Sequence, residues 1–203
     1  MIITFARGFG SGGKTIAKML AEELGVNCYG RNIVRLASDE SGISEDLFAQ
    51  ADEKRKYSLL KFAPSKHDKA LSPPESNDFV SNDNLFKFQA NVIKNLAQNE
   101  SAVIIGRCAD YVLKDYDNLI SVFIHADLET SVNNVVDMYG VPEHEAKKLI
   151  EKNNKSRSEY YKYYTGQNWE NAKNYDLCLD SSNLGYEKCV DIIKAYIKVR
   201  ISG

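Results

Sequence analysis

The sequence has few of the residues from which metal and disulfide sites are built. Its 203 residues include four cysteines, three histidines and four prolines. Cys28, Cys108, Cys178 and Cys189 form no C-x-x-C pair, and no histidine stands beside any of them. This spacing argues against a zinc site and against a disulfide framework. We therefore expect reduced cysteines in an intracellular, cytoplasmic protein.

An excess of one charge and long apolar runs are also missing. With 26 basic and 28 acidic residues the formal net charge is −2, so there is no global basic field to hold a nucleic-acid polymer or an anionic membrane. A local cluster of Arg and Lys would still suffice for a small anionic ligand. No run approaches the roughly 20 apolar residues of a membrane span, and residues 1–6 are too short for a signal-peptide core.

Short apolar runs alternate with amphipathic stretches along one continuous domain, residues 1–203. Runs typical of strands buried on both faces occupy residues 2–6, 102–105, 119–124 and 177–179. Apolar residues at helical spacing occupy residues 15–24 before Gly25, 85–96 after possible caps at Asn82 and Asp83, the segment from Asp127 to Gly140, and 186–201. This alternation predicts a doubly wound α/β fold.

Two segments interrupt the alternation. Residues 64–84 hold three of the four prolines and many Ser, Asn and Asp residues, so we expect a long, mobile loop there. Residues 143–169 are strongly charged and then aromatic, which predicts a largely exposed helix followed by an aromatic face.

The strongest motif lies between the first strand and the first helix. Residues 8–15, GFGSGGKT, match G-x-x-x-x-G-K-[ST] at every fixed position. Glycines let successive N–H groups point inward around phosphate oxygens, and the helix that follows adds its positive end. The strand before the motif and the helix after it argue against a chance match. The residues expected to bind the phosphates are Gly8, Gly10, Ser11, Gly12, Gly13, Lys14 and Thr15.

Within this P-loop, Lys14 is expected to reach the β- and γ-phosphates of ATP, and the Thr15 hydroxyl to ligate Mg²⁺. The loop indicates a nucleotide but not a reaction. The chain has no N/T-K-x-D segment of the kind that GTPases use to read the base, and it is small for a motor ATPase. Its size and scattered arginines favour a nucleoside or nucleotide kinase.

Four segments together resemble the cytidylate kinase-like family, bacterial relatives of the nucleoside monophosphate kinases. They are residues 9–13, 104–111, 160–166 and 175–181. The resemblance implies a P-loop NTPase three-layer fold with a five-stranded parallel sheet, an acceptor-binding insert at 30–84 and a helical lid at 143–169. It implies transfer of the γ-phosphoryl group of ATP to CMP, dCMP or a similar small acceptor.

Several charged residues fit such a site, each with an alternative. Arg107 follows a buried strand and is expected to hold an acceptor phosphate, or to form a surface salt bridge with Asp110. Asp110 would accept from a ribose hydroxyl or base amine, or cap a short helix. In the lid, Arg157 and Lys152, and less so Lys155, would deliver cations to the phosphoryl group, or form a solvated helix face.

Further candidates flank these segments. Arg7, before the loop, and Arg31, after the second strand, would each meet a ligand or a carboxylate. Asp180 and Ser181 would approach the adenine-side loop or cap the next helix. The aromatic residues Tyr161, Tyr164 and Trp169 would stack on a base or dock the lid on the body, and we favour docking.

The chain departs from the family pattern at three positions. Ile105 stands where cytidylate kinases carry an acidic residue before Gly-Arg, Gly30 stands where an Asp is expected, and Asn154 replaces an acidic lid residue. Mg²⁺ would then depend on Thr15, water and another carboxylate. These departures keep two alternatives open. One is a kinase for a different small acceptor; the other is a nucleotide-binding regulator whose protein partner grips residues 64–84.

Overall fold

The structure, a computed structural model, describes residues 1–54 and 70–201. Five parallel strands form one sheet in the order β2-β3-β1-β4-β5. The strands are β1 (Ile2–Arg7), β2 (Asn27–Tyr29), β3 (Ala102–Ile105), β4 (Leu119–His125) and β5 (Leu177–Asp180). The predicted α/β fold with a five-stranded parallel sheet is therefore confirmed.

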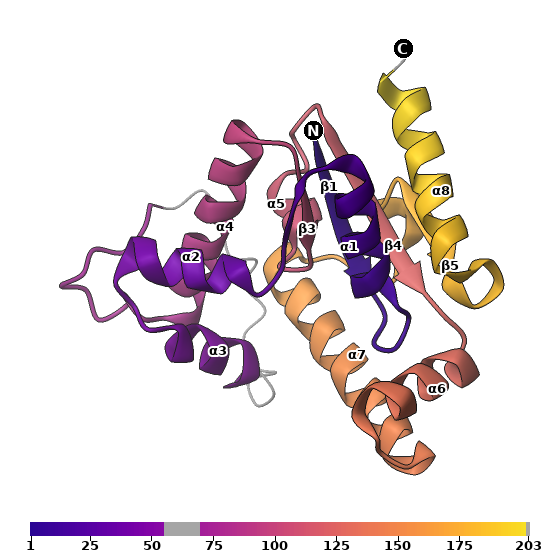
Figure 1. The fold of residues 1–203 in the computed structure, drawn as a ribbon. Helices are drawn as coiled ribbons and strands as arrows, with labels where there is room; N and C mark the ends of the chain where they lie inside the picture. The colour runs from indigo at the N-terminus through magenta and orange to yellow at the C-terminus, as the bar shows by residue number, and fades with distance from the viewer. Residues whose placement is uncertain (55–69, 202–203) are drawn as a thin grey trace.

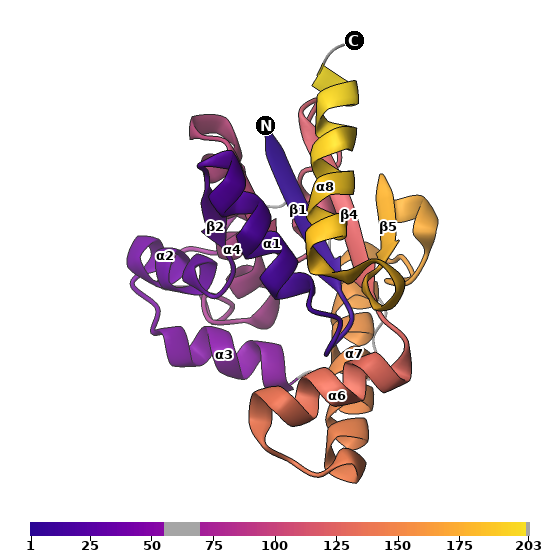
Figure 2. The same cartoon turned by 45° about the vertical axis from the view of Figure 1, so that its right-hand side comes forward.

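Helices cover both faces of this sheet and extend beyond its carboxyl ends (Figure 1). The helices are α1 (Gly13–Leu24), α2 (Asn32–Ser41), α3 (Glu45–Lys54), α4 (Asn82–Asn99), α5 (Ala109–Val112), α6 (Leu128–Tyr139), α7 (Glu143–Thr165) and α8 (Ser181–Ile201), with a short 3₁₀ helix η2 (Ala172–Asn174). Helices α1 and α8 lie side by side on one face (Figure 2). In the described ranges, none of these helices combines the length and the apolar character that crossing a membrane would require.

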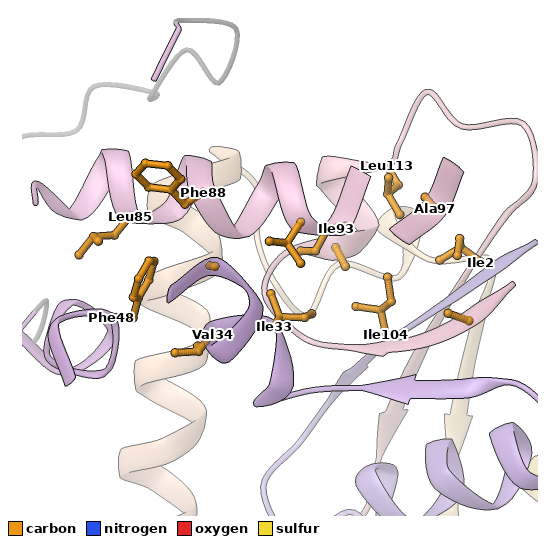
Figure 3. Close-up of a cluster of buried hydrophobic side chains, with 14 of the residues drawn as sticks. Ile2, Ile33, Val34, Phe48, Leu85, Phe88, Ile93, Ala97, Ile104 and Leu113 are labelled. Atoms are coloured by element: carbon orange, nitrogen blue, oxygen red, sulfur yellow. The ribbon is translucent and has the colours of Figure 1, made fainter. Parts of the chain in front are cut away.

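The two faces of the sheet bury separate apolar clusters. On one face, Ile3, Phe5 and Val122 pack against α1 and α8. On the other, Ile2 and Ile104 pack against α4, and the same cluster continues outward to Ile33 of α2 and Phe48 of α3 (Figure 3). Strands buried on both faces explain the continuous apolar runs of the sequence.

Helix boundaries follow local chemistry closely, with one correction. Gly25 and Gly140 end α1 and α6 in the left-handed conformation, and the Asp127 carboxylate caps α6 by accepting from the Thr130 amide. The cap of α4 is Ser81, whose hydroxyl accepts from the Asn84 amide, so the expected caps Asn82 and Asp83 were wrong by one and two positions. The predicted helix over 186–201 is the part of α8 that follows a kink at Gly185, and a short helical segment from Ser181 precedes the kink.

The predicted loop at 64–84 is only partly described. Residues 70–81 form turns that α4 holds in place: the Asn84 side chain accepts from the Ser72 amide and donates to the Phe79 carbonyl. Residues 82–84 belong to α4, which corrects the loop boundary. Residues 64–69 lie outside the described residues.

Helix α7 is attached to the body by two different surfaces. Near its start, Ala146 and Ile150 pack against Val132 and Val135 of α6. Near its end, the ring of Tyr164 stacks on that of Phe86 in α4 with the centroids 3.7 Å apart. The charged helix is therefore less exposed than its composition suggested, because both ends bury apolar or aromatic side chains.

This packing predicts that Phe86→Ala will lower the free energy of unfolding by about 3–5 kcal/mol, since Phe86 is 1% exposed and its ring fills the space between α4 and α7. Urea unfolding followed by circular dichroism measures the loss. Val199→Ala, at a position 76% exposed, is the control and should change the value by less than about 0.5 kcal/mol. Equal effects of the two substitutions would contradict the packing.

Candidate active site

The glycine-rich loop, residues 8–15, connects the end of β1 to the start of α1. The Gly8 amide donates to the Ile124 carbonyl at 2.9 Å, which ties the loop to β4. Gly12 precedes α1 at φ 71°, and a Cβ there would lie 2.2 Å from the Tyr186 ring. Glycine is therefore required at this position both by the backbone conformation and by the close approach of α8.

Two serines brace the loop from inside. The buried Ser11 hydroxyl donates to the Gly8 carbonyl at 2.9 Å and accepts from the Gly13 amide at 3.3 Å. The Ser181 hydroxyl donates to the Ser11 carbonyl at 2.7 Å. Ser181 therefore braces the glycine-rich loop, while Asp180 accepts from the Ser182 amide and caps the first turn of α8, as the capping alternative predicted.

The open end of α1 suits a phosphate group. Gly12 supplies no side-chain cap and the first turn has no acidic residue, so no negative charge within the helix neutralises its positive dipole end. Lys14 and Thr15 are exposed there. The Thr15 hydroxyl can give Mg²⁺ one oxygen, with phosphate and water supplying the others. Over residues 1–54 and 70–201 there is no cluster of three His, Cys, Asp or Glu side chains that would hold a metal by itself.

Beside the loop, a cavity of about 200 Å³ opens at the carboxyl ends of β1 and β3. Arg7, Arg107 and Arg157 all line it, from β1, the turn after β3 and α7 respectively. Asp110 is the one carboxylate among its described lining residues. The tertiary structure thus brings together three predicted site residues, Arg107, Asp110 and Arg157, with Arg7.

A strained turn presents Arg107 to this cavity. Gly106, Arg107 and Cys108 are all left-handed, with φ of 74°, 61° and 52°. Left-handed backbone at non-glycine residues costs roughly 1–3 kcal/mol each and is concentrated at functional sites. The Arg107 guanidinium donates to the Gln89 side-chain oxygen at 3.0 Å, and Gln89 is 1% exposed.

Gln89 was missed by sequence reasoning, although a signal existed. It lies four residues after Leu85 and four before Ile93, in the middle of the apolar stripe of α4. A buried polar side chain in such a stripe needs a hydrogen-bond partner, which here is Arg107.

Asp110 is held by an aromatic hydroxyl. The Tyr161 hydroxyl donates to the Asp110 carboxylate at 2.6 Å. Burial raises the pKa of Asp110 to about 6, opposed by the hydrogen bonds from Tyr161 and the backbone. Burial, and then the nearby Asp110 charge, raise the pKa of the Tyr161 hydroxyl well above its usual range. Asp110 thus lines the cavity with a carboxyl group whose ionisation is costly.

Helix α7 contacts the glycine-rich loop directly. The Asn154 side-chain oxygen accepts from the Phe9 amide at 2.7 Å, and the Arg157 guanidinium donates to the Arg7 carbonyl at 2.7 Å while lying over the Phe9 ring. Burial lowers the pKa of Arg157 to about 10. Asn154, where an acidic residue was expected, thus acts as a neutral acceptor for the loop backbone.

Other predicted residues lie elsewhere. Lys152 and Lys155 are exposed on α7, and Arg31 is exposed at the start of α2; none of the three lines the cavity. The aromatic residues Tyr161 and Trp169 are both 4% exposed and pack into the body, as the docking interpretation predicted.

The departures at Gly30 and Ile105 adjoin each other. A Cβ on Gly30 would lie 3.9 Å from the Ile105 Cβ, and Ile105 is a cavity-lining residue. This wall therefore brings no negative charge to a cavity that already holds three arginines.

The profile of the cytidylate kinase-like family matches residues 2–183. The chain belongs to the cytidylate kinase-like family. Its similarity to a cytidylate kinase of Methanopyrus kandleri is 26% identity over 198 residues, 97% of this chain and 93% of the relative.

Two solved structures are also similar to this chain. An uncharacterized protein from Eubacterium ventriosum is 28% identical, with a TM-score of 0.71 over 98% of both chains. Shikimate kinase from Bacteroides thetaiotaomicron is 11% identical, with a TM-score of 0.54 over 98% of both chains. The second likeness concerns the fold alone.

The buried carboxyl of Asp110 predicts a pH dependence of stability. Because its pKa is raised to about 6 in the folded protein, the folded state keeps a proton that the unfolded chain releases from about pH 4 upward. The free energy of unfolding therefore falls as pH rises through this window. Relative to Asp110→Asn, the unsubstituted protein should lose about 3 kcal/mol between about pH 4 and about pH 7.

Urea unfolding at a series of pH values measures this difference. Asp39→Asn is the control, because the Asp39 side chain is 63% exposed, and its curve should run parallel to that of the unsubstituted protein. Parallel curves for Asp110→Asn as well would show that Asp110 titrates in the folded state as it does in the unfolded chain.

Proposed function

We propose that the protein transfers the γ-phosphoryl group of ATP to a nucleoside monophosphate, with CMP and dCMP as the first candidates. The observation that carries the proposal is the adjacency of two anion-binding features: the glycine-rich loop at the start of α1 and the cavity lined by Arg7, Arg107 and Arg157. Membership of the cytidylate kinase-like family supports the same reaction class.

On the donor side, the loop amides and Lys14 hold the β- and γ-phosphates, and Thr15 gives one ligand to Mg²⁺. When bound, the metal ion neutralises charge on the transferring phosphoryl group. The exposed positions of Lys14 and Thr15 at the open end of α1 support these roles. Positioning and charge neutralisation supply most of the rate in phosphoryl transfer, so no protein side chain is assigned as a general base.

On the acceptor side, Arg107 holds the acceptor phosphate, supported from behind by Gln89. Asp110, which accepts a hydrogen bond from the Tyr161 hydroxyl, lines the same cavity. Its carboxylate accepts a further hydrogen bond from the sugar or the base of the acceptor. Arg157 approaches the phosphoryl group from α7. We assign residues 143–169 as the lid and residues 30–84, described at 30–54 and 70–84, as the acceptor-binding insert. Arg31 and Lys152, both exposed in this structure, are further candidates for ligand contact.

The proposal predicts that Lys14→Ala will lower turnover by about 10²-fold or more while leaving the fold intact, because the substitution removes a cation that stabilises charge mainly in the transition state. An ADP-release assay with ATP, Mg²⁺ and CMP or dCMP measures turnover, and circular dichroism checks the fold. Lys18→Ala, at an exposed position one turn further along α1, is the matched control and should keep near-normal turnover.

The acceptor is tested in the same assay with dCMP, CMP, UMP, AMP, GMP and nucleosides. Turnover on CMP or dCMP that disappears in Lys14→Ala supports the proposal. Silence on every acceptor by a protein that still binds ATP would contradict it and favour the nucleotide-binding regulator. Turnover on a different acceptor would retain the kinase and change its substrate.

A further inference from the structure

The side chain of Arg7 occupies a position between the two halves of the site. Its stem packs against the glycine-rich loop: a Cβ on Gly13 would lie 2.6 Å from the Arg7 Cβ. Its guanidinium lies beneath the turn after β3, where a Cβ on Gly106 would lie 2.4 Å from the Arg7 Nη1. Arg7 thus touches a donor-side residue with its stem and an acceptor-side residue with its charge.

Among the described residues, no carboxylate neutralises this charge. Within residues 1–54 and 70–201, the Arg7 guanidinium has neither a carboxylate in salt-bridge range nor a hydrogen-bond acceptor. Burial, and then the nearby cations of Arg157 and Arg107, lower the pKa of Arg7 to about 9. The sequence left two partners open for Arg7, a ligand or a carboxylate. The described residues supply no carboxylate, which leaves the ligand.

The surroundings are shaped around this side chain. Glycine at 13 and 106 leaves the space that Arg7 fills, and the left-handed backbone at Gly106 turns the chain over the guanidinium. The part of Arg7 that is not covered faces the cavity that Arg107 and Arg157 also line. A buried cation without a partner is costly, so a bound dianion offsets an existing penalty as well as making new bonds.

We infer that Arg7 binds the phosphate group of the acceptor, alongside Arg107, and thereby selects phosphorylated acceptors over the corresponding nucleosides. The inference rests on the proposed function for the identity of the acceptor and on the geometry of Arg7 for its role. A planar guanidinium can make two parallel hydrogen bonds to one phosphate, which an ammonium group cannot.

The test compares Arg7→Met and Arg7→Lys with the control Arg200→Met. Arg200 is a surface residue near the end of α8 that pairs with Asp176 and does not line the cavity. Isothermal titration measures the affinities for CMP, cytidine and ATP. Arg7→Met should weaken CMP binding by about 10- to 100-fold, the value of a charge-assisted hydrogen bond, with the affinities for cytidine and ATP within about twofold of the unsubstituted protein. Arg7→Lys should show the same selectivity with a smaller loss.

A purely structural role for Arg7 gives a different pattern, since it would weaken CMP, cytidine and ATP together. That pattern, or CMP affinity equal to that of Arg200→Met, overturns the inference. Should Arg7→Met fail to fold, the CMP-to-cytidine affinity ratio of Arg7→Lys decides: a lowered ratio supports the inference and an unchanged ratio refutes it.

A separate titration keeps this inference apart from the proposed function. In a Lys14→Ala background, which weakens the glycine-rich loop, the difference in inorganic phosphate affinity with and without Arg7→Met reports on the cavity. If phosphate binding in this background depends on Arg7, while the protein with Lys14 intact phosphorylates no acceptor, the role of Arg7 is supported and the kinase is refuted. If phosphate binding is independent of Arg7, while the protein with Lys14 intact is an active kinase, the role of Arg7 is refuted and the kinase is supported.

Discussion

Three guanidinium groups share one cavity at the carboxyl edge of the sheet, and the surrounding packing has to hold them there against their mutual repulsion. Burial lowers the pKa of both Arg7 and Arg157, and the nearby charges of Arg157 and Arg107 lower the pKa of Arg7 further. The described lining contributes one carboxylate, Asp110, which burial makes costly to ionise. A bound anion would relieve this arrangement, so the unbalanced charge is the physical basis of the proposed activity.

Helices on several sides hold the glycine-rich loop and the cavity in place. Helix α8 approaches the glycine-rich loop through Tyr186 and Ser181, and α7 holds the loop backbone through Asn154 and Arg157. The aromatic end of α7 is in turn docked on α4 by the stack of Tyr164 on Phe86. Helix α7 is therefore attached both to the loop and to the body, and any lid motion has to break these contacts.

The elements of the fold were predictable because each depends on local chemistry. Strand β3 and the helix stops at Gly25 and Gly140 followed from apolar runs and from glycine, whose signals act within a few residues. The errors also arose locally: Ser81 caps α4 in place of its equally suitable neighbours Asn82 and Asp83, since the direction in which the chain enters the helix decides among adjacent polar residues.

The sequence by itself determined the α/β alternation, the glycine-rich loop and the family, since these depend on periodicity and on a contiguous motif. Only the tertiary structure decided which of the charged residues meet. It joined Arg7, Arg107 and Arg157 in one cavity, left Lys152 and Arg31 exposed, gave Gln89 a role and set Gly30 beside Ile105. The physical reason is that a side chain's charge is visible in sequence, whereas its partner can come from a segment 150 residues away, as with Arg157 and Arg7.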